Sequence, residues 1–439
     1  MTPQRVNYGG LVGQASAVRT DGADAGSSSA DRPFTFASGN RSKILGLPRY
    51  ALGSARSAIT RRDPRLWVIG SHFGLGDGAL AFLNAARLAH RGLRLVWLVA
   101  TEADARRATT LGIDWCARDS SAGLELTLRA GVAAVTHGFG DVNRYGLRGA
   151  TIVQLWHGSP LKKLHLDSPA ALNVGRLGTI PGVRPMIREM YRRGTRQISL
   201  FPVAAQHFVP SICSAFDLTP TQVMALGEPR TDVLFAGSIA ERIARARALL
   251  ADRLPGLGDR RVVLYAPTWR DGEPDPSIPS PAQWARIEDV FRRSNRVLAV
   301  RPHPLGVGAY RHSSDVVRLL TADQQPESMP LLWGLDALIT DYSSMLFDMA
   351  VTGAPMIFLA PDLEHYAASR GLYENYAEIT GGRWSTSWDQ VLDRIEGLED
   401  PQREQRLRDH SASLAETFHD HHDGRNAERV VQQVLQLRS

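Results

Sequence analysis

Short apolar runs alternate with longer segments of helical pattern through the first half of the chain. The helical pattern covers residues 78–90 and a segment that begins at residue 103, and the apolar runs are 66–69, 93–99, 133–135 and 151–156. Short apolar runs bounded by turn residues are typical of strands buried on both faces of a sheet. Their alternation with helices predicts right-handed βαβ units and a parallel sheet.

The same alternation begins again in the second half of the chain, with apolar runs at 261–265, 297–300, 337–339 and 355–359. The predicted fold class is therefore α/β, with two doubly wound, Rossmann-like parallel-sheet domains that face each other across a cleft. The crossing between them is expected within residues 198–234. The last helix, after Glu404, either closes the second domain or packs back on the first.

Length and composition refine this division. A chain of 439 residues exceeds what one hydrophobic core usually serves. Residues 1–40 are rich in small and polar residues, lack an apolar period and are predicted to be disordered. We therefore expect an N-terminal domain over residues 41–235 and a C-terminal domain over residues 236–439.

Composition also excludes several classes of protein. A hydrophobic content of 43% and a charged content of 22% are ordinary for a globular protein, and no stretch reaches the ~20 consecutive apolar residues of a membrane span. Cys116 and Cys213 lie far apart, without the spacing of a disulfide framework or a zinc site. No signal-peptide pattern opens the chain, so we expect a protein of the reducing cytoplasm.

Positive charge is concentrated in two segments of a chain whose net charge is +6. Residues 41–62 and 176–196 mix arginines with apolar residues, and the second segment holds a single acid, Glu189. This pattern favours a surface that lies on anionic lipid. A solvated basic face and a nucleic-acid patch are the alternatives, and we expect no nucleic-acid partner. The residues predicted to contact the membrane are Arg184, Arg188, Arg192 and Arg193.

A strand-to-helix junction at residues 339–348 carries the first candidate chemistry. An apolar run ends at Asp341, and Ser343 and Ser344 open an expected helix. Free backbone amides at a helix start, together with two small hydroxyl side chains, suit a phosphate group. Helix capping is the alternative for Asp and Ser at such a position.

Two histidines follow other expected strands. His157 lies where a strand ends in a turn, and an imidazole there is able to accept a proton from a hydroxyl nucleophile. His303 is held between two prolines beside Arg301, and donors of this kind suit phosphoryl oxygens. Thr268 and Arg270 follow a further strand. Because ligands bind at the carboxyl ends of parallel strands, we expect these groups to form one phosphate-handling site.

Seven motifs occur in order along the chain and together resemble a known family. They are residues 156–162, 227–232, 265–270, 301–304, 341–344, 362–366 and 423–425. The set is similar to the CDP-glycerol glycerophosphotransferase family, the teichoic-acid and capsule-type polyol-phosphate primases and polymerases. The match runs from about residue 132 to residue 430, some two thirds of the chain.

The resemblance implies a GT-B-like fold and a peripheral protein on the cytoplasmic side of the cell membrane. It implies an enzyme that moves a polyol phosphate from a CDP-polyol donor, such as CDP-glycerol, onto a hydroxyl of a lipid-linked acceptor, with release of CMP. The acceptor would be a polyprenyl-diphosphate-linked saccharide or a growing polyol-phosphate polymer. The N-terminal domain would serve the acceptor, and the C-terminal domain would bind the donor.

The resemblance also implies roles for individual residues. His157 and His303 would be catalytic, His157 as the base and His303 with Arg301 at the donor diphosphate. Ser343 and Ser344 would hold the diphosphate oxygens. The motifs do not separate the roles of the other substrate-binding candidates, which are Arg230, Asp232, Thr268, Arg270 and Asp341.

The chain departs from the family pattern at three places. Ser159 stands where threonine is more usual, Glu228 stands where an aromatic residue is more familiar, and the first 130 residues show no clear match. The choice of acceptor and polyol therefore stays open. No cofactor is certain: Asp341, Asp348 and Asp362 are able to ligate Mg²⁺, although no spacing among them demands a metal.

Two rival functions fit the same sequence. A nucleotide-sugar glycosyltransferase uses the same two-sheet plan and would release UDP or GDP, because fold does not fix function. A membrane-docked scaffold would keep the cleft without turnover, although the presence of both histidines argues against it.

Overall fold

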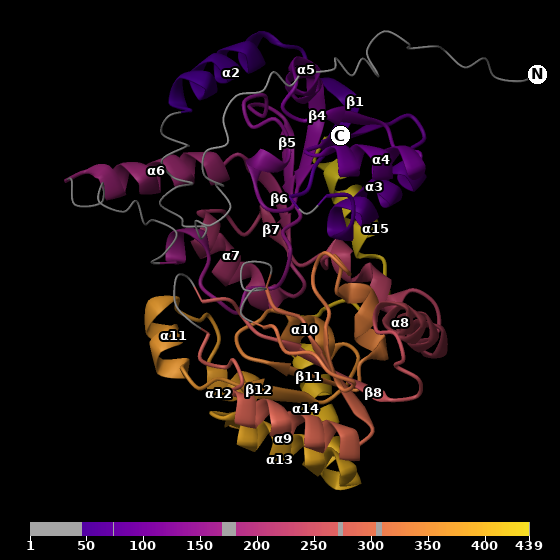
Figure 1. The fold of residues 1–439 in the computed structure, drawn as a ribbon. Coiled ribbons are helices and arrows are strands. Elements are labelled where there is room, and N and C mark those ends of the chain that lie inside the picture. The colour runs from indigo at the N-terminus through magenta and orange to yellow at the C-terminus, as the bar shows by residue number, and fades with distance from the viewer. Residues whose placement is uncertain (1–45, 73, 169–180, 271–274, 304–309, 439) are drawn as a thin grey trace, which may run out of the picture.

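The computed structural model describes residues 46–72, 74–168, 181–270, 275–303 and 310–438 (Figure 1). The disorder expected for residues 1–40 falls outside the described residues. Parts of the two basic segments, 41–45 and 176–180, lie outside them as well.

The N-terminal sheet is parallel throughout and has the strand order β3-β2-β1-β4-β5-β6-β7 in the described part of the chain. Chain order runs outward from β1 in both directions, which is the doubly wound arrangement. Its strands are β1 (Asp63–Ile69), β2 (Arg94–Val99), β3 (Trp115–Ala117), β4 (Ala130–Val135), β5 (Thr151–Gln154), β6 (Ile198–Pro202) and β7 (Val223–Met224).

The C-terminal sheet repeats this plan. Its order is β10-β9-β8-β11-β12-β13, again parallel at every pairing that the described residues contain. Its strands are β8 (Arg261–Ala266), β9 (Arg296–Val300), β10 (Val317–Leu319), β11 (Ala337–Thr340), β12 (Met356–Leu359) and β13 (Trp384–Ser385). The predicted α/β class with two doubly wound sheets is confirmed.

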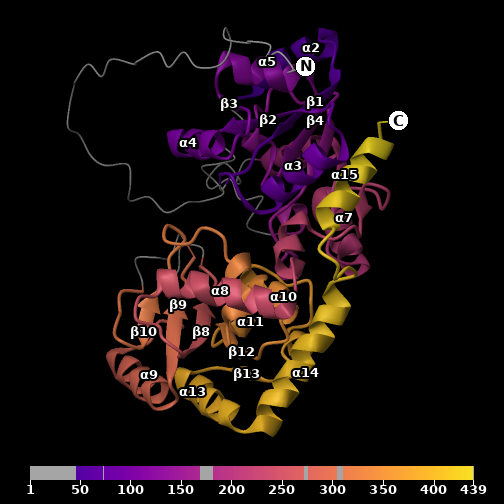
Figure 2. The same cartoon turned by 90° about the vertical axis from the view of Figure 1, so that its right-hand side faces the viewer.

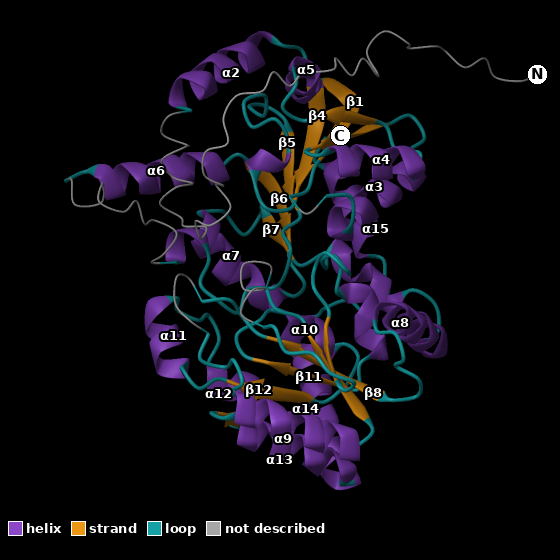
Figure 3. Cartoon of the chain, viewed as in Figure 1, coloured by secondary structure: helices purple, strands orange, loops and turns teal. Residues whose placement is uncertain are grey.

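Helices separate the strands and cover the sheets (Figure 3). Around the N-terminal sheet they are α2 (Leu47–Ile59), α3 (Asp77–Ala89), α4 (Glu102–Thr110), α5 (Ser121–Arg129), α6 (Val183–Thr195) and α7 (Val209–Phe216). Those that follow are α8 (Ile239–Arg253), α9 (Pro281–Arg293), α10 (Met345–Ala350), α11 (Leu363–Ser369), α12 (Tyr376–Ile379), α13 (Trp388–Glu396), α14 (Pro401–Phe418) and α15 (Asn426–Gln436). Two 3-10 helices also matter below, η6 (Pro229–Phe235) and η8 (Met329–Gly334).

Successive strand residues enter different hydrophobic cores. Val68 lies in one cluster, and its neighbours Trp67 and Ile69 lie in another. Leu264 and Val263 divide in the same way between two clusters of the C-terminal sheet. Because side chains alternate across a strand, both faces of each sheet are buried, which explains why these strands are continuous apolar runs in the sequence.

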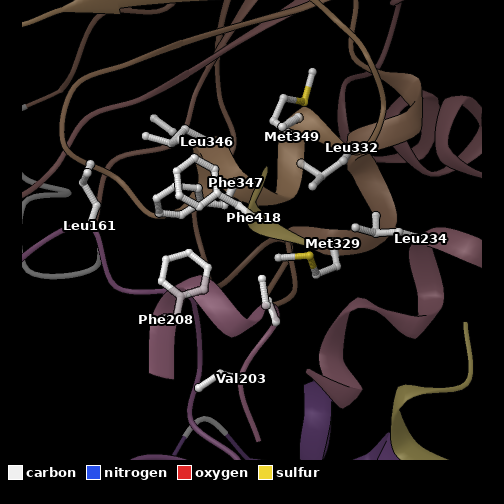
Figure 4. Packing of buried hydrophobic residues seen from close by; sticks show 14 of the residues in the cluster. Leu161, Val203, Phe208, Leu234, Met329, Leu332, Leu346, Phe347, Met349 and Phe418 are labelled. Atoms are coloured by element: carbon white, nitrogen blue, oxygen red, sulfur yellow. The ribbon is translucent and has the colours of Figure 1, made fainter. Parts of the chain in front are cut away.

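One of these clusters continues from the first domain into the second (Figure 4). Phe208, which precedes α7, lies against Phe347 of α10 and Phe418 of α14, with ring centroids 5.4 Å apart in both pairs. A shared apolar core of this kind fixes how the two sheets face each other.

The segment expected to contain the crossing between domains is mostly part of the first one. Residues 198–234 include β6 and β7, which pair with each other and join the N-terminal sheet at β5. We propose that the boundary lies near residue 235, where η6 ends and α8 begins to pack on η8.

The last two helices connect the domains a second time. In Figure 2, α14 runs along the C-terminal domain and α15 returns to lie beside α3 of the N-terminal domain. Val430, Val431 and Val434 of α15 are fully buried in the same cluster as α3. Arg438, after α15, donates to the Thr151 hydroxyl of β5 at 3.1 Å.

Candidate active site

His157 lies three residues beyond the end of β5, in the turn toward the C-terminal domain. Trp156 before it has a φ of 58°, so the chain leaves the sheet abruptly. The His157 Nδ1 atom lies 3.4 Å from the Thr136 carbonyl oxygen. A carbonyl oxygen only accepts, so this contact places the proton on Nδ1 and leaves the lone pair on Nε2.

The His157 ring still meets solvent, although protein surrounds it on most sides. This combination is typical of a side chain in a cleft between domains. Desolvation, together with the charges of Arg230 and Lys162, lowers the pKa of His157 to about 4. The imidazole is therefore neutral at neutral pH.

The chain approaches the C-terminal domain closely just after His157. A Cβ added to Gly158, whose φ is 153°, would lie 3.0 Å from the Ser344 hydroxyl oxygen. Ser344 is the residue before α10, and its neighbour Ser343 accepts from the Met345 amide at 3.3 Å. Both serines are half-buried. The two predicted serines and His157 therefore lie on opposite sides of one junction.

His303 follows β9, on the C-terminal side of the junction. Its ring is stacked with Trp269, with centroids 6.1 Å apart. Burial, and then the charge of Lys162, lowers the pKa of His303 to about 4, although its side chain is exposed. The neighbouring Arg301 points elsewhere, because its guanidinium donates to the carbonyl oxygens of Leu320 and Pro326.

Lys162 is the last residue of the first motif, 156–162, and the sequence alone assigned it no role. Its backbone forms an antiparallel bridge with Leu372 of the C-terminal domain. Its charge acts on both His157 and His303, so it lies near both rings. Burial, followed by the charge of Arg370, lowers the pKa of Lys162 to about 8. The sequence signal was its place five residues after His157, on the same turn.

Arg270 and Asp341 form a buried scaffold beneath this junction. The Arg270 guanidinium donates to both oxygens of Asp362 and to one oxygen of Asp341, and it lies over the rings of Tyr342 and Tyr366. The other Asp341 oxygen accepts from the Thr268 amide at 2.9 Å. These contacts argue against direct substrate binding by Arg270 and Asp341, since both charges are already neutralised by protein.

Thr268 itself remains a candidate. Its side chain is 7% exposed, and its hydroxyl makes no hydrogen bond of full geometry among the residues that the structure describes, since its contact with the Asp341 carboxylate falls short of one. An unsatisfied buried hydroxyl costs about 1–3 kcal/mol. A ligand oxygen would remove that cost.

Arg230 also has protein partners in place of the expected substrate. Its guanidinium donates to both oxygens of Asp348 at 2.9 and 2.7 Å and to Glu228 at 2.7 Å. All three side chains are at most 4% exposed. Glu228 and Arg230 belong to the N-terminal domain, and Asp348 belongs to α10 of the C-terminal domain. This ion cluster therefore links the two domains close to Ser344.

Asp232 caps a helix. Its two carboxylate oxygens accept from the amides of Asn426 and Ala427, each at 2.8 Å, at the start of α15. This is the usual work of an acid at a helix N-terminus. The sequence could not reveal it, because the helix lies almost two hundred residues further along the chain.

The predicted magnesium ligands are all engaged with arginines. Asp341 and Asp362 pair with Arg270, and Asp348 pairs with Arg230. Within the described ranges, no group of three or more His, Cys, Asp or Glu side chains is arranged to hold a metal ion.

The basic helix α6 extends away from the N-terminal sheet, at the left of Figure 1. Within α6 only Ile187 and Thr195 are buried, while Arg184, Arg188 and Arg193 are exposed together with Met186. A cavity of about 430 Å³ lies beside this helix, where Arg192 and Arg196 pair with Asp217, and neither His157 nor His303 lines it. Of the helices described, none is both long and apolar enough for a bilayer crossing.

Two further histidines lie at this junction, and sequence reasoning missed both. The ring of His137, after β4, is stacked on His157 with centroids 3.9 Å apart and planes 4° apart. The ring centroid of His72, after β1, lies 5.2 Å from that of His137. The signal was present, since each follows an apolar strand by two or three residues.

Curated relatives of the chain act in teichoic acid synthesis. It is 28% identical over 291 residues to the teichoic acid ribitol-phosphate polymerase TarK of Staphylococcus aureus, covering 65% of this chain and 52% of the relative. It is 28% identical over 294 residues to the teichoic acid glycerol-phosphate transferase of the same organism, covering 65% and 71%. The chain thus spans about half the length of TarK.

A solved structure shares the fold. The wall teichoic acid polymerase TagF superposes with a TM-score of 0.70 and 21% identity, covering 91% of this chain and 96% of that one. The GT-B-like arrangement of two sheets is thereby confirmed. The family model described as CDP-Glycerol:Poly(glycerophosphate) glycerophosphotransferase matches residues 54–436. The chain belongs to this glycerophosphotransferase family.

Proposed function

We propose that the protein transfers a polyol phosphate from a CDP-polyol to a hydroxyl of a teichoic-acid-like or capsule-like acceptor and releases CMP. One observation carries this proposal: the His157 turn of the N-terminal domain meets Ser344 of the C-terminal domain. A base and a set of hydrogen-bond donors suited to phosphate then face each other across the junction. Membership of the family supplies the expected donor class.

The C-terminal side of the junction fits a diphosphate. Three adjacent strands, β9, β8 and β11, lead to the groups on this side. His303 follows β9, the Thr268 hydroxyl follows β8, and the hydroxyls of Ser343 and Ser344 follow β11. Lys162 adds a positive charge from the N-terminal side. Because α10 has only six residues, the side-chain donors rather than the helix dipole would hold the oxygens.

The transfer step needs one proton acceptor. The acceptor hydroxyl gives its proton to Nε2 of His157 while its oxygen attacks the phosphorus that carries the polyol. A new phosphorus–oxygen bond forms, the diphosphate bridge breaks, and CMP leaves with the electron pair. Negative charge on the bound donor would raise the pKa of His157 toward neutrality, where a general base is most effective.

Four buried charged residues act indirectly in this proposal, by holding other groups in place: Arg230, Arg270, Asp341 and Asp348. Their buried ion pairs hold the strand ends and α10, so that Ser344 lies beside the His157 turn. Arg301 would act in the same way, by bonding the chain after β10 next to His303. The only role of Asp232 in this proposal would be to cap the start of α15.

The acceptor is proposed to reach the site from an anionic membrane surface, on the cytoplasmic side. The exposed arginines of α6, with Met186 among them, support this orientation. A polyprenyl-diphosphate-linked saccharide or a polyol-phosphate chain would then present its hydroxyl to His157. TagF and the curated relatives are named for teichoic acid polymers, which agrees with this acceptor class.

Purified protein incubated with acceptor and one donor at a time tests this function. CDP-glycerol or CDP-ribitol should release CMP and extend the acceptor by a phosphodiester-linked polyol. Release of UDP or GDP from a nucleotide sugar would favour the glycosyltransferase. Donor binding without release of any nucleotide would favour the scaffold.

A further inference from the structure

Three neighbouring strands of the N-terminal sheet each end in a histidine. The sheet order places β1, β4 and β5 side by side, and His72, His137 and His157 follow them within three residues. The rings of His137 and His157 are stacked and almost parallel, with centroids 3.9 Å apart and planes 4° apart.

The loop that carries His137 is held firmly. One Asp141 carboxylate oxygen accepts from the Thr136 amide at 2.8 Å, from the His137 amide at 2.7 Å and from the Thr136 hydroxyl at 3.1 Å. Gln154 donates to the Thr136 carbonyl at 3.0 Å. The same short loop therefore fixes both the His137 ring and the carbonyl oxygen that His157 contacts.

We propose that His137 is a positioning residue for His157: its ring is the flat surface that keeps the His157 imidazole turned with Nδ1 toward the Thr136 carbonyl and Nε2 available as the base. This inference rests on the proposed function and adds a residue to it. His137 itself touches no reacting atom in this scheme.

Stacking also controls the charge of the pair. Burial, and then the neighbouring His157 and His72, lower the pKa of His137 to about 2. The groups that face His157 are His137 and His72 from the sheet, Lys162 from its own turn and Arg230 from η6. Burial and then the charges of Arg230, Lys162 and His72 lower the pKa of His157, and the hydrogen bond with the Thr136 carbonyl raises it. The His137 ring covers one face of the imidazole.

Three variants separate positioning from simple packing. His137→Ala removes the ring, so water also reaches the face of His157 that this ring covered, and the pKa of His157 should rise by at least one unit in the free protein. His137→Phe keeps a flat ring of similar area and should keep the low pKa. His312→Ala is the matched control, because His312 is also a stacked imidazole, on Trp284 at 4.6 Å, but lies on the C-terminal domain away from the junction.

The pKa is measured by NMR titration of the histidine ring signals, with the His157 signal identified by its loss in His157→Gln. This readout needs no turnover, so it stands even if the native protein releases no CMP, which would overturn only the proposed function. In the active enzyme, His137→Ala should lower kcat at least tenfold near pH 6 and leave the donor KM within twofold, and His137→Phe should restore most of kcat.

Two results would overturn the inference. One is an unchanged His157 titration in His137→Ala. The other is a loss of kcat in His137→Phe as large as in His137→Ala, since that would mean that the imidazole nitrogens and not the ring surface are needed. His312→Ala should change neither the titration nor kcat.

Discussion

At the scale of residues, the buried arginines of the junction bind carboxylates that lie far away in the chain. His157 and His303 were predicted as site residues because each follows an apolar run, and their roles stay predictions. Arg230 and Arg270 were identified in their motifs, but their partners, Asp348 and Asp362, lie 118 and 92 residues further along the chain. An arginine that binds phosphate and one that binds a distant carboxylate look alike in a single sequence.

Lys162 gives the site a predicted pH dependence. Its pKa of about 8 means that the ammonium is charged below pH 8 and neutral above it. We therefore expect the dissociation constant for CDP-glycerol to be constant between about pH 6 and 7 and to increase as pH rises through 8. Isothermal titration calorimetry across this range measures it.

Two substitutions of Lys162 check the cause. Lys162→Arg keeps the charge at alkaline pH and should remove the increase. Lys162→Met should bind weakly at every pH. An increase in the dissociation constant near pH 8 that persists in Lys162→Met would assign the titration to another group.

Arg230 should matter for stability as well as for geometry. Arg230→Ala leaves Glu228 and Asp348 buried without their counter-charge, which costs about 3–5 kcal/mol. For domains of this size such a loss lowers the thermal midpoint by roughly 6–20 °C. Circular dichroism melting measures the shift.

The matched control is Arg286→Ala, which removes an exposed ion pair with Asp389 whose side chains are 56% and 54% exposed. Such a pair contributes about 0–1 kcal/mol. Equal midpoints for the two variants would mean that the buried cluster does not hold the domains together.

At the scale of elements, apolar runs predicted the central strands well, since β1, β2, β4, β5, β8, β9, β11 and β12 each overlap an expected run. The strands that were missed, β3, β7, β10 and β13, are two or three residues long and lie at or near the sheet edges. Strands this short carry too few side chains for a pattern. The five-residue β6 was missed because it lies in the segment expected to cross between domains.

Helix α6 carries the prediction for membrane binding. Reversing the exposed arginines Arg184, Arg188 and Arg193 to Glu removes three attractive charges, each contributing about 1 kcal/mol near an anionic surface. Partitioning onto phosphatidylglycerol vesicles should therefore fall by at least roughly a hundredfold, as measured by co-sedimentation.

The control reverses Arg286 and Arg293 of α9, which are also exposed but lie on the C-terminal domain. That variant should sediment as the native protein does. If the α6 variant also sediments fully, the membrane surface lies on another element.

At the scale of the whole molecule, two doubly wound sheets follow from the repeated alternation of strands and helices. The way they meet does not follow from any local pattern. It depends on Phe208 packing on Phe347 and Phe418, on the Arg230 cluster and on the return of α15 to α3. Each of these joins residues more than a hundred positions apart, which a pattern within one window cannot contain.

In the proposed reaction, the two sides of the junction act differently on one donor molecule. The N-terminal side supplies the base, and the C-terminal side holds the diphosphate. A change on the N-terminal side should therefore alter turnover without altering donor affinity, and a change on the C-terminal side should weaken donor affinity.

The most direct test measures donor affinity and CMP release together in two variants. His157→Gln should bind CDP-glycerol within about threefold of the native protein and lose roughly 10²–10⁴ in turnover. The double variant Ser343→Ala, Ser344→Ala should bind the donor at least tenfold more weakly. Native turnover in His157→Gln, or unchanged donor affinity in the serine variant, would contradict a site built across this junction.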